Sequence, residues 1–210
     1  MSAEAYIQLP PDSTGKRVRS IQKTVGTNIV QEEVFVVGSP RRLVGVYQYA
    51  SPVVSGSTTA GYVYHSIFNP STSTNLMAVR RIVINWVTVA AAVYIEGALY
   101  RITAASGGTA FPATSVGKKD TGYPTPTVEI RHSGVTVTLE NKMFNLITPG
   151  AAGQITGIFN LSFDRGDGRS DIILRPGQGL ALRQEAAGST GFRVSIMVEW
   201  EEFQGVTVTT

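Results

Sequence analysis

The sequence predicts an all-β protein, an antiparallel β-sandwich of the jelly-roll type with an extended N-terminal arm. Strand-length apolar segments are separated by turn signals about every 8–12 residues, which is typical of sandwiches. Frequent valine and threonine, together with 22 glycines and 10 prolines, favour strands and tight turns. Helical periodicity of apolar residues is not sustained over three turns anywhere. About eight to ten strands with long cross-connections favour a jelly roll over a barrel.

Residues 1–40 form the predicted arm, and residues 41–210 form the predicted sandwich domain. The arm begins with "LPPDSTGKR", which is polar and rich in turn formers. The stretch "IQKTVGTNIVQEEVFVVGSP" then mixes short apolar runs with polar breaks, which indicates one or two short strands. Such an arm either wraps its own domain or lies on a neighbouring subunit.

Four strand candidates follow the arm in order. They are "LVGVYQY" (43–49), "YVYHSIF" (62–68), "LMAVRRIVINWVTVA" (76–90) and "VYIEGALYRITAA" (93–105). Turn signals such as Asn69–Pro70 and Gly107–Gly108 mark their ends. The third candidate has apolar side chains on both faces, which predicts a central strand covered on both sides. Gly97, within the fourth, predicts a bulge or a bend.

The middle of the domain has a less regular pattern. Residues 109–126 are predicted to form the longest loop, and long ordered loops often make functional contacts. The next stretch, "VEIRHSGVTVTLE", predicts two short strands on either side of Ser133–Gly134. The segment "KMFNLI" suits a single helical turn, "GQITGIFNLSF" alternates weakly as a strand does, and "DRGDGRS" predicts a sharp turn.

A hairpin is predicted to close the domain. Leu180 and Leu182 share one face of its first strand. In its second strand, apolar and polar residues alternate with period two, which predicts one buried and one solvent-facing side. The inward residues are Phe192, Val194, Ile196, Val198 and Trp200, and the outward residues are Arg193, Ser195, Met197, Glu199 and Glu201. Burial of five such inward side chains contributes on the order of 10 kcal/mol before the entropy cost is subtracted.

The charge and composition argue against several classes of protein. Charged residues make up only 16% of the chain, so uncharged polar side chains or neighbouring subunits must cover its surface. A net charge of +3 without a basic block argues against nucleic-acid binding. The absence of cysteine excludes disulfides and thiolate chemistry. The longest apolar run, 82–95, is too short to span a membrane, and the N-terminus has no signal core; we expect a soluble protein without an export signal or membrane contact.

The candidate catalytic and binding side chains are few. His65 and His132 lie in separate strand candidates without metal-ligand spacing, so we expect structural or surface roles for them. Ser133 adjoins His132, but neighbours on a strand point to opposite faces, which argues against a hydrolase triad. Tyr62 and Tyr64 share a strand face and form either part of the core, which is favoured, or a platform that stacks on carbohydrate.

The turn after residue 163 is acidic and rich in glycine. Asp164, Asp167 and Asp171 have the close spacing of calcium ligands, but the EF-hand pattern is incomplete, and a plain acidic turn is favoured. The tripeptide Arg165–Asp167 matches an adhesion motif, although such short matches arise by chance in turns. We therefore expect no enzymatic activity, no catalytic residue, no cofactor and no metal site.

Three stretches resemble the β-sandwich virion proteins of tailed bacteriophages, in the style of head decoration and minor structural proteins. They are "YHSIFNPSTSTNLMAVRRIVIN", "ALYRITAASGGTAFPAT" and "IILRPGQGLALRQEAAGSTGFRVSIMVEWEE", within residues 60–202. The resemblance implies a virion protein, assembled in the host cytoplasm, that binds the major capsid protein or other virion subunits. It also implies a homo-oligomer, with three copies favoured, and carries no catalytic motif.

The resemblance favours a capsid decoration or cement protein, whose many weak contacts add up over the head lattice. The alternative is a host-recognition or carbohydrate-binding module associated with the tail or a fibre. A cupin-type enzyme is disfavoured because its clustered metal ligands are missing from the sequence.

Overall fold

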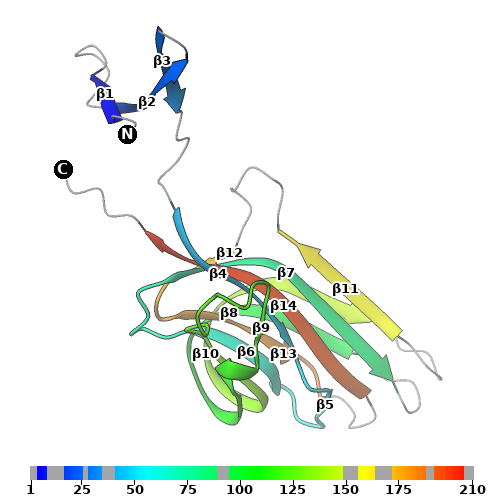
Figure 1. Cartoon of the computed structure of the whole chain (residues 1–210). Coiled ribbons are helices and arrows are strands. Elements are labelled where there is room, and N and C mark those ends of the chain that lie inside the picture. Colours follow the sequence, from blue (N-terminus) through cyan, green and yellow to red (C-terminus); the bar gives the residue numbers. More distant parts are fainter. Residues whose placement is uncertain are drawn as a thin grey trace. The chain divides into compact units, whose positions relative to one another are not determined.

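The computed structural model describes residues 4–8, 17–25, 28–34, 41–88, 95–148, 156–163, 172–187 and 192–205 of the chain (Figure 1). The chain divides into two compact units. The first comprises residues 1–41 together with 205–210, and the second comprises residues 42–204. The sequence therefore passes from one unit to the other at two points.

Three antiparallel strands form a sheet in the first unit, in the order β1-β2-β3. They are β1 (Glu4–Gln8), β2 (Arg17–Val25) and β3 (Asn28–Val34). The stretch 21–40, which was predicted to carry one or two short strands, contains β3 and part of β2, whereas β1 was not predicted. Charged and polar residues interrupt the apolar alternation of β2, "RVRSIQKTV", which hides a nine-residue strand from pattern analysis.

The second unit is a β-sandwich of two antiparallel sheets. Among the described strands, eight long ones make up these sheets: β4 (Arg41–Ala50), β6 (Val63–Asn69), β7 (Leu76–Thr88), β8 (Ile95–Phe111), β10 (Glu129–Thr148), β11 (Thr156–Ser162), β13 (Gln178–Gln184) and β14 (Phe192–Gly205). The strand orders are β11-β7-β14-β4 and β10-β6-β13-β8. Ranked along the chain, these are orders 6-3-8-1 and 5-2-7-4, the arrangement of a jelly roll made of two Greek keys. The predicted fold class is confirmed.

Shorter elements complete the sandwich. The strands β5 (Val54–Ser55), β9 (Gly117–Lys118) and β12 (Ile172–Leu174) pair with β14, β4 and β7 respectively. The predicted loop 109–126 contains the end of β8, a single 3-10 turn η2 (Ala113–Ser115) and β9. Val116 and Pro126 within it are buried, so this loop is packed against the sandwich.

β8 and β10 form one long ribbon that closes the second sheet on itself. β10 pairs with β8 along most of its length, and its first four residues, Glu129–His132, also pair with β6. Two opposed kinks permit this curvature. Gly107 and Gly108 in β8 have φ of 65° and 60°, and Ser133 and Gly134 in β10 have φ of 63° and 78°.

The strand ends predicted at these kinks are wrong. β8 continues past Gly108 to Phe111, and β10 runs unbroken from Glu129 to Thr148, so "KMFNLI" is part of a strand and not a helical turn. A Cβ at Gly108 would lie 2.6 Å from the carbonyl oxygen of His132, so the ribbon can bend there only with glycine. The residue types that suit a turn also suit a kink inside a paired ribbon.

Gly97 lies in a regular part of the ladder. It pairs with Leu146 on one side and Gln184 on the other, without a register shift at that point, so the predicted bulge is wrong. A Cβ at this position would lie 2.8 Å from Cη2 of Trp86. The glycine is therefore required by close packing under an indole ring and not by a bend.

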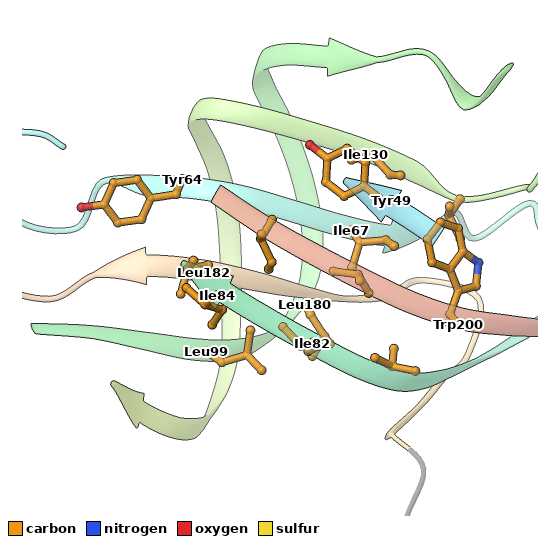
Figure 2. Packing of buried hydrophobic residues seen from close by; sticks show 14 of the residues in the cluster. Tyr49, Tyr64, Ile67, Ile82, Ile84, Leu99, Ile130, Leu180, Leu182 and Trp200 are labelled. Carbon is orange, nitrogen blue, oxygen red and sulfur yellow. The ribbon is translucent and has the colours of Figure 1, made fainter. Parts of the chain in front are cut away.

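The main core lies between the two sheets (Figure 2). Ile82 and Ile84 of β7 pack in one cluster with Leu180 and Leu182 of β13 and with Trp200 of β14. The alternation predicted for β14 is confirmed for its described inward side chains, Val194, Ile196, Val198 and Trp200, which are all buried. The side chain of Phe192 lies outside the described residues.

β7 is a central strand, but its two faces differ. Ile82, Ile84 and Trp86 are buried, whereas Arg81 is exposed and Val83 is half-buried. Among the described side chains, the second face of this strand is therefore at most partly covered, as expected for a two-layered sandwich, and the side chains of Val87 and Val89 lie outside the described residues. The closed second sheet is different: its four strands also contribute to a second, smaller apolar cluster of Val63, Ala98, Tyr100, Ile102, Val135 and Ala181.

Candidate functional site

Glu202, near the end of β14, is fully buried and accepts hydrogen bonds from three residues. Its Oε1 accepts from the backbone N–H of Thr127 at 2.9 Å and from Trp200 Nε1 at 3.5 Å. Its Oε2 accepts from Asn75 Nδ2 and from Thr127 Oγ1, both at 3.0 Å. These four donors replace the water that the carboxyl group loses on burial.

Tyr47 of β4 lies beside this group. Its ring centroid is 5.6 Å from that of Trp200 and 6.3 Å from that of Tyr123, and its hydroxyl donates to the carbonyl of Pro124 at 3.1 Å. Burial, and then the charge of Glu202 and the neighbouring Tyr123, raise the pKa of Tyr47 to about 12. The cluster fastens the loop before β10 to β4 and β14. The Glu202 carboxyl group is inaccessible to solutes, and its hydrogen bonds hold the loop before β10 in place.

The structure brings the two histidines together. His65 of β6 and His132 of β10 are paired in the ladder, with ring centroids 6.3 Å apart. Burial, and then repulsion from His132, lower the pKa of His65 from 6.5 to about 3, outweighing the opposing effect of the Val194 backbone. Burial also lowers the pKa of the half-buried His132. The pair is therefore held in the uncharged form near neutral pH.

Ser133 approaches His132 despite being its neighbour on a strand. His132 Nδ1 and Ser133 Oγ are 2.9 Å apart, because the left-handed backbone at Ser133 turns its side chain toward the imidazole. The expectation that the two side chains point to opposite faces is wrong. No carboxylate bonds to His132 in the described part of the chain, so the third member of a hydrolase triad is not found there.

A small void in the main core adjoins His65. Its volume is about 10 Å³, which is enough for one water-sized sphere and no larger ligand. Three buried residues present polar atoms here that have no hydrogen-bond partner of normal geometry among the described residues: the Tyr49 hydroxyl, both His65 ring nitrogens and the Ser66 hydroxyl. The other lining side chains, such as Ile82 and Leu180, are aliphatic. The void is thus a small apolar packing gap beside residues whose polar atoms lack partners.

A surface recess of about 350 Å³ lies beside the edge of β4. It is lined by Gln48, Ala50, Ser115, Gly117, Lys118 and Lys119. Lys119 Nζ is 3.7 Å from Glu199 Oε1, a long ion pair, and Gln48 Nε2 donates to Met197 Sδ at 3.1 Å. Two ammonium groups beside a hydroxyl and an amide suit a small polar ligand that carries an anionic group.

The other predicted site residues have clear outcomes. Tyr64 is fully buried and donates from its hydroxyl to Gln184 Oε1, and Tyr62 packs edge-on against it with centroids 5.4 Å apart. The favoured core interpretation is confirmed for Tyr64, and a stacking platform of two exposed rings is excluded. The candidate calcium ligands Asp164, Asp167 and Asp171, and the tripeptide that they overlap, lie outside the described residues.

Four further findings concern the class of protein. Within the described ranges, no group of three or more His, Cys, Asp or Glu side chains is arranged to hold a metal ion. The same residues include no helix with the length and apolar composition needed to cross a bilayer. No known protein family matches the chain, and no curated protein is significantly similar to it. The functional inference therefore rests on the fold and on the sites above.

Sequence reasoning missed three features of these sites. Glu202 lies two residues after Trp200, so period-two alternation places its side chain on the inward face. A charged residue is usually expected on the outward face. Lys118 and Lys119 lie inside the loop that was predicted to make contacts, but nothing in the loop indicates a recess. The His65–His132 pair leaves no local signal, because it depends on the pairing of β6 with β10.

Proposed function

We propose that the chain is a non-enzymatic structural protein of a bacteriophage particle, a capsid decoration or cement subunit that binds and stabilises the head shell as a homo-oligomer. The observation that carries this proposal is the division of the chain into a jelly-roll unit and a separate three-stranded unit. One unit serves as a rigid body, and the other as an attachment element.

The three-stranded unit is small for an independently stable fold. Units of about 40 residues usually need disulfides, metals or oligomerisation, and a three-stranded sheet needs a covered apolar face. The chain has no cysteine, so disulfides are excluded. Our proposal assigns the covering surface to neighbouring virion subunits, and repetition over the head lattice turns many weak contacts into strong binding.

The jelly-roll unit supports the role of a rigid body. Its main core is filled by large buried side chains, including Trp86 and Trp200. Glu202 fastens the long loop before β10, and the kinked β8–β10 ribbon closes the second sheet. Such packing resists deformation, which suits a subunit that reinforces a shell.

Deleting residues 1–38 is expected to leave the jelly-roll unit folded and to abolish attachment. The unit 42–204 has its own core, so we expect cooperative thermal unfolding to persist. Loss of the multivalent contacts is expected to reduce co-sedimentation with undecorated phage heads by about 100-fold or more.

An unfolded truncation product would contradict the assignment of residues 1–41 as a separate unit. The decoration role has an independent test in images of intact particles. Full-length protein at many equivalent lattice positions is expected, whereas a few copies confined to the tail would contradict the proposal.

The alternative, a host-recognition or carbohydrate-binding module on a tail or fibre, is favoured by one observation. The recess beside β4 combines Lys118 and Lys119 with hydrogen-bonding groups, and its volume of about 350 Å³ lies within the usual range of ligand pockets. Under this alternative, the ligand is an acidic sugar whose carboxylate meets the ammonium groups.

Titration with N-acetylneuraminic or glucuronic acid, followed by NMR, tests this alternative. If it is correct, shifts are expected around residues 115–119, and Lys118→Ala is expected to weaken binding about tenfold through loss of a charge-assisted hydrogen bond. Lys142→Ala, which changes a lysine outside the recess, is the control. Equal shifts with inorganic phosphate would show general anion binding, and no shift at millimolar sugar would exclude the alternative.

A further inference from the structure

β11 forms one margin of the first sheet. It pairs with β7 from Thr156↔Val87 to Ser162↔Arg81, and among the described strands nothing pairs with its other side (Figure 1, yellow). About half of the backbone N–H and C=O groups of an edge strand point away from its only neighbour. As far as the described strands go, β11 therefore has one side at which a second strand can pair.

β11 itself carries no lysine, no proline and no bulge, which are three of the features by which edge strands normally avoid pairing. Natural edges carry lysine, proline, bulges or a covering segment. The sequence of β11, "TGIFNLS", has no charged residue and no proline, and its seven pairs with β7 follow one another without a register shift. The opposite margin differs, because β9 pairs with β4 there and brings in Lys118 and Lys119.

The side chains of β11 are also unusually apolar for an edge. Ile158 is 66% exposed, the highest value for a large hydrophobic side chain in the described residues. Phe159 and Leu161 are only partly buried and pack against the main core from the other face. Pairing with another strand would cover the flanks of all three side chains, and removal of this apolar area from water favours association.

The strand pattern favours a second copy of the chain as the partner. Antiparallel pairing about a two-fold axis at Phe159 places Ile158 of each copy opposite Asn160 of the other, and Gly157 opposite Leu161. Inward residues then meet inward residues, so the faces of the joined sheets stay aligned. Like charges never oppose each other, and each leucine faces a glycine that leaves room for it.

We propose that β11 is a self-association edge, at which two copies join their β11-β7-β14-β4 sheets into one continuous sheet. This inference deepens the proposed homo-oligomer, since it names the contact between copies. It predicts a two-fold dimer or a multiple of it, in contrast to the three copies that the resemblance favours. Association in solution is independent of shell binding, so the two proposals fail separately.

Light scattering coupled to size-exclusion chromatography tests the contact with the full-length protein. The wild type is expected to be dimeric, and Ile158→Lys is expected to raise the dimer dissociation constant at least tenfold, because a lysine would be placed at the joined edge. Val53→Lys, a matched change at a side chain that is 62% exposed outside β11, is expected to remain dimeric. Thermal unfolding verifies that both variants are folded.

Cysteine crosslinking determines the register. The chain contains no cysteine, so single variants at residues 158, 159 and 160 crosslink only through the introduced thiol. Phe159→Cys is expected to give the most disulfide dimer, because only this residue faces itself across the axis. A monomeric or trimeric wild type, an Ile158→Lys variant that still dimerises, or a crosslink maximum elsewhere would each overturn the proposal.

Discussion

Replacing Glu202 with alanine is expected to lower the free energy of unfolding by roughly 3 to 5 kcal/mol. The change removes the acceptor of Asn75 Nδ2 and of both donors of Thr127, all at 2.9–3.0 Å. Each buried donor left without a partner costs about 1–3 kcal/mol, and the vacated volume adds to this loss. Thermal denaturation is expected to show a melting temperature lower by roughly 10 °C.

The neighbouring residue provides the matched control. Glu201 points to the other face of β14 and pairs with Arg80 at 2.6 Å, with both side chains about a quarter exposed. Because such surface pairs contribute little, Glu201→Ala is expected to cost less than about 1 kcal/mol. Glu202→Gln keeps one acceptor oxygen, but its amide NH₂ group faces the donors of Asn75 or Thr127. An intermediate loss of about 1–3 kcal/mol in the free energy of unfolding is therefore expected. If Glu201→Ala and Glu202→Ala lowered the free energy of unfolding equally, Glu202 would not hold the loop before β10 in place.

The contrast between these two glutamates shows what local pattern analysis predicts well. Period-two alternation assigned the faces of β14 correctly from Val194 to Trp200, because every inward residue there is apolar. The same geometry continues to Glu202, but side-chain polarity suggests the opposite face. A buried carboxyl group requires donors from Asn75 and Thr127, which are distant in the sequence. The backbone period was therefore the better guide than the residue type.

The ribbon of β8 and β10 shows where local analysis fails. Gly107–Gly108 and Ser133–Gly134 predict strand ends in the sequence because glycine and serine are frequent in turns. In the structure the two pairs face each other across one ladder, and together they bend it. Whether such residues end a strand or kink it depends on the pairing partner, which is a non-local property. The jelly-roll class, in contrast, follows from composition, segment lengths, the spacing of turn signals and the long connections, all of which are visible along the chain.

Lowering the pH from 7 to 5 is expected to reduce the unfolding free energy of the wild type by about 2 kcal/mol, chiefly through His65. Its pKa is about 3 in the folded protein and 6.5 when unperturbed. Above pH 6.5 both states are neutral and stability is complete. Between pH 6.5 and 3 only the unfolded state binds the proton, so stability falls by about 1.4 kcal/mol per pH unit. Below pH 3 both states are protonated, and the loss levels off at about 5 kcal/mol.

The carboxyl group of Glu185 contributes to acid sensitivity in a lower pH window. Burial raises the pKa of Glu185. Hydrogen bonds from Lys142 and Tyr100, and the charges of Lys142 and Arg183, together outweigh this effect, so that the net pKa lies below 4.5. Its stabilising effect is complete above pH 4.5 and is lost only as the pH falls through its folded pKa. Urea unfolding between pH 7 and pH 5 therefore isolates the histidines.

His65→Phe is the decisive variant for this assignment. It removes the titrating group and its two unpartnered nitrogens, so we expect the unfolding free energy to vary much less between pH 7 and 5 than in the wild type. His132→Gln removes the repelling neighbour and is expected to keep a reduced slope, since burial, the larger cause, still acts on His65. Because His65 pairs with His132 next to the Ser133–Gly134 kink, acid is expected to loosen the β6–β10 closure first. Amide exchange at residues 129–132 would then rise before exchange in β13, and an unchanged pH slope in His65→Phe would place the titration elsewhere.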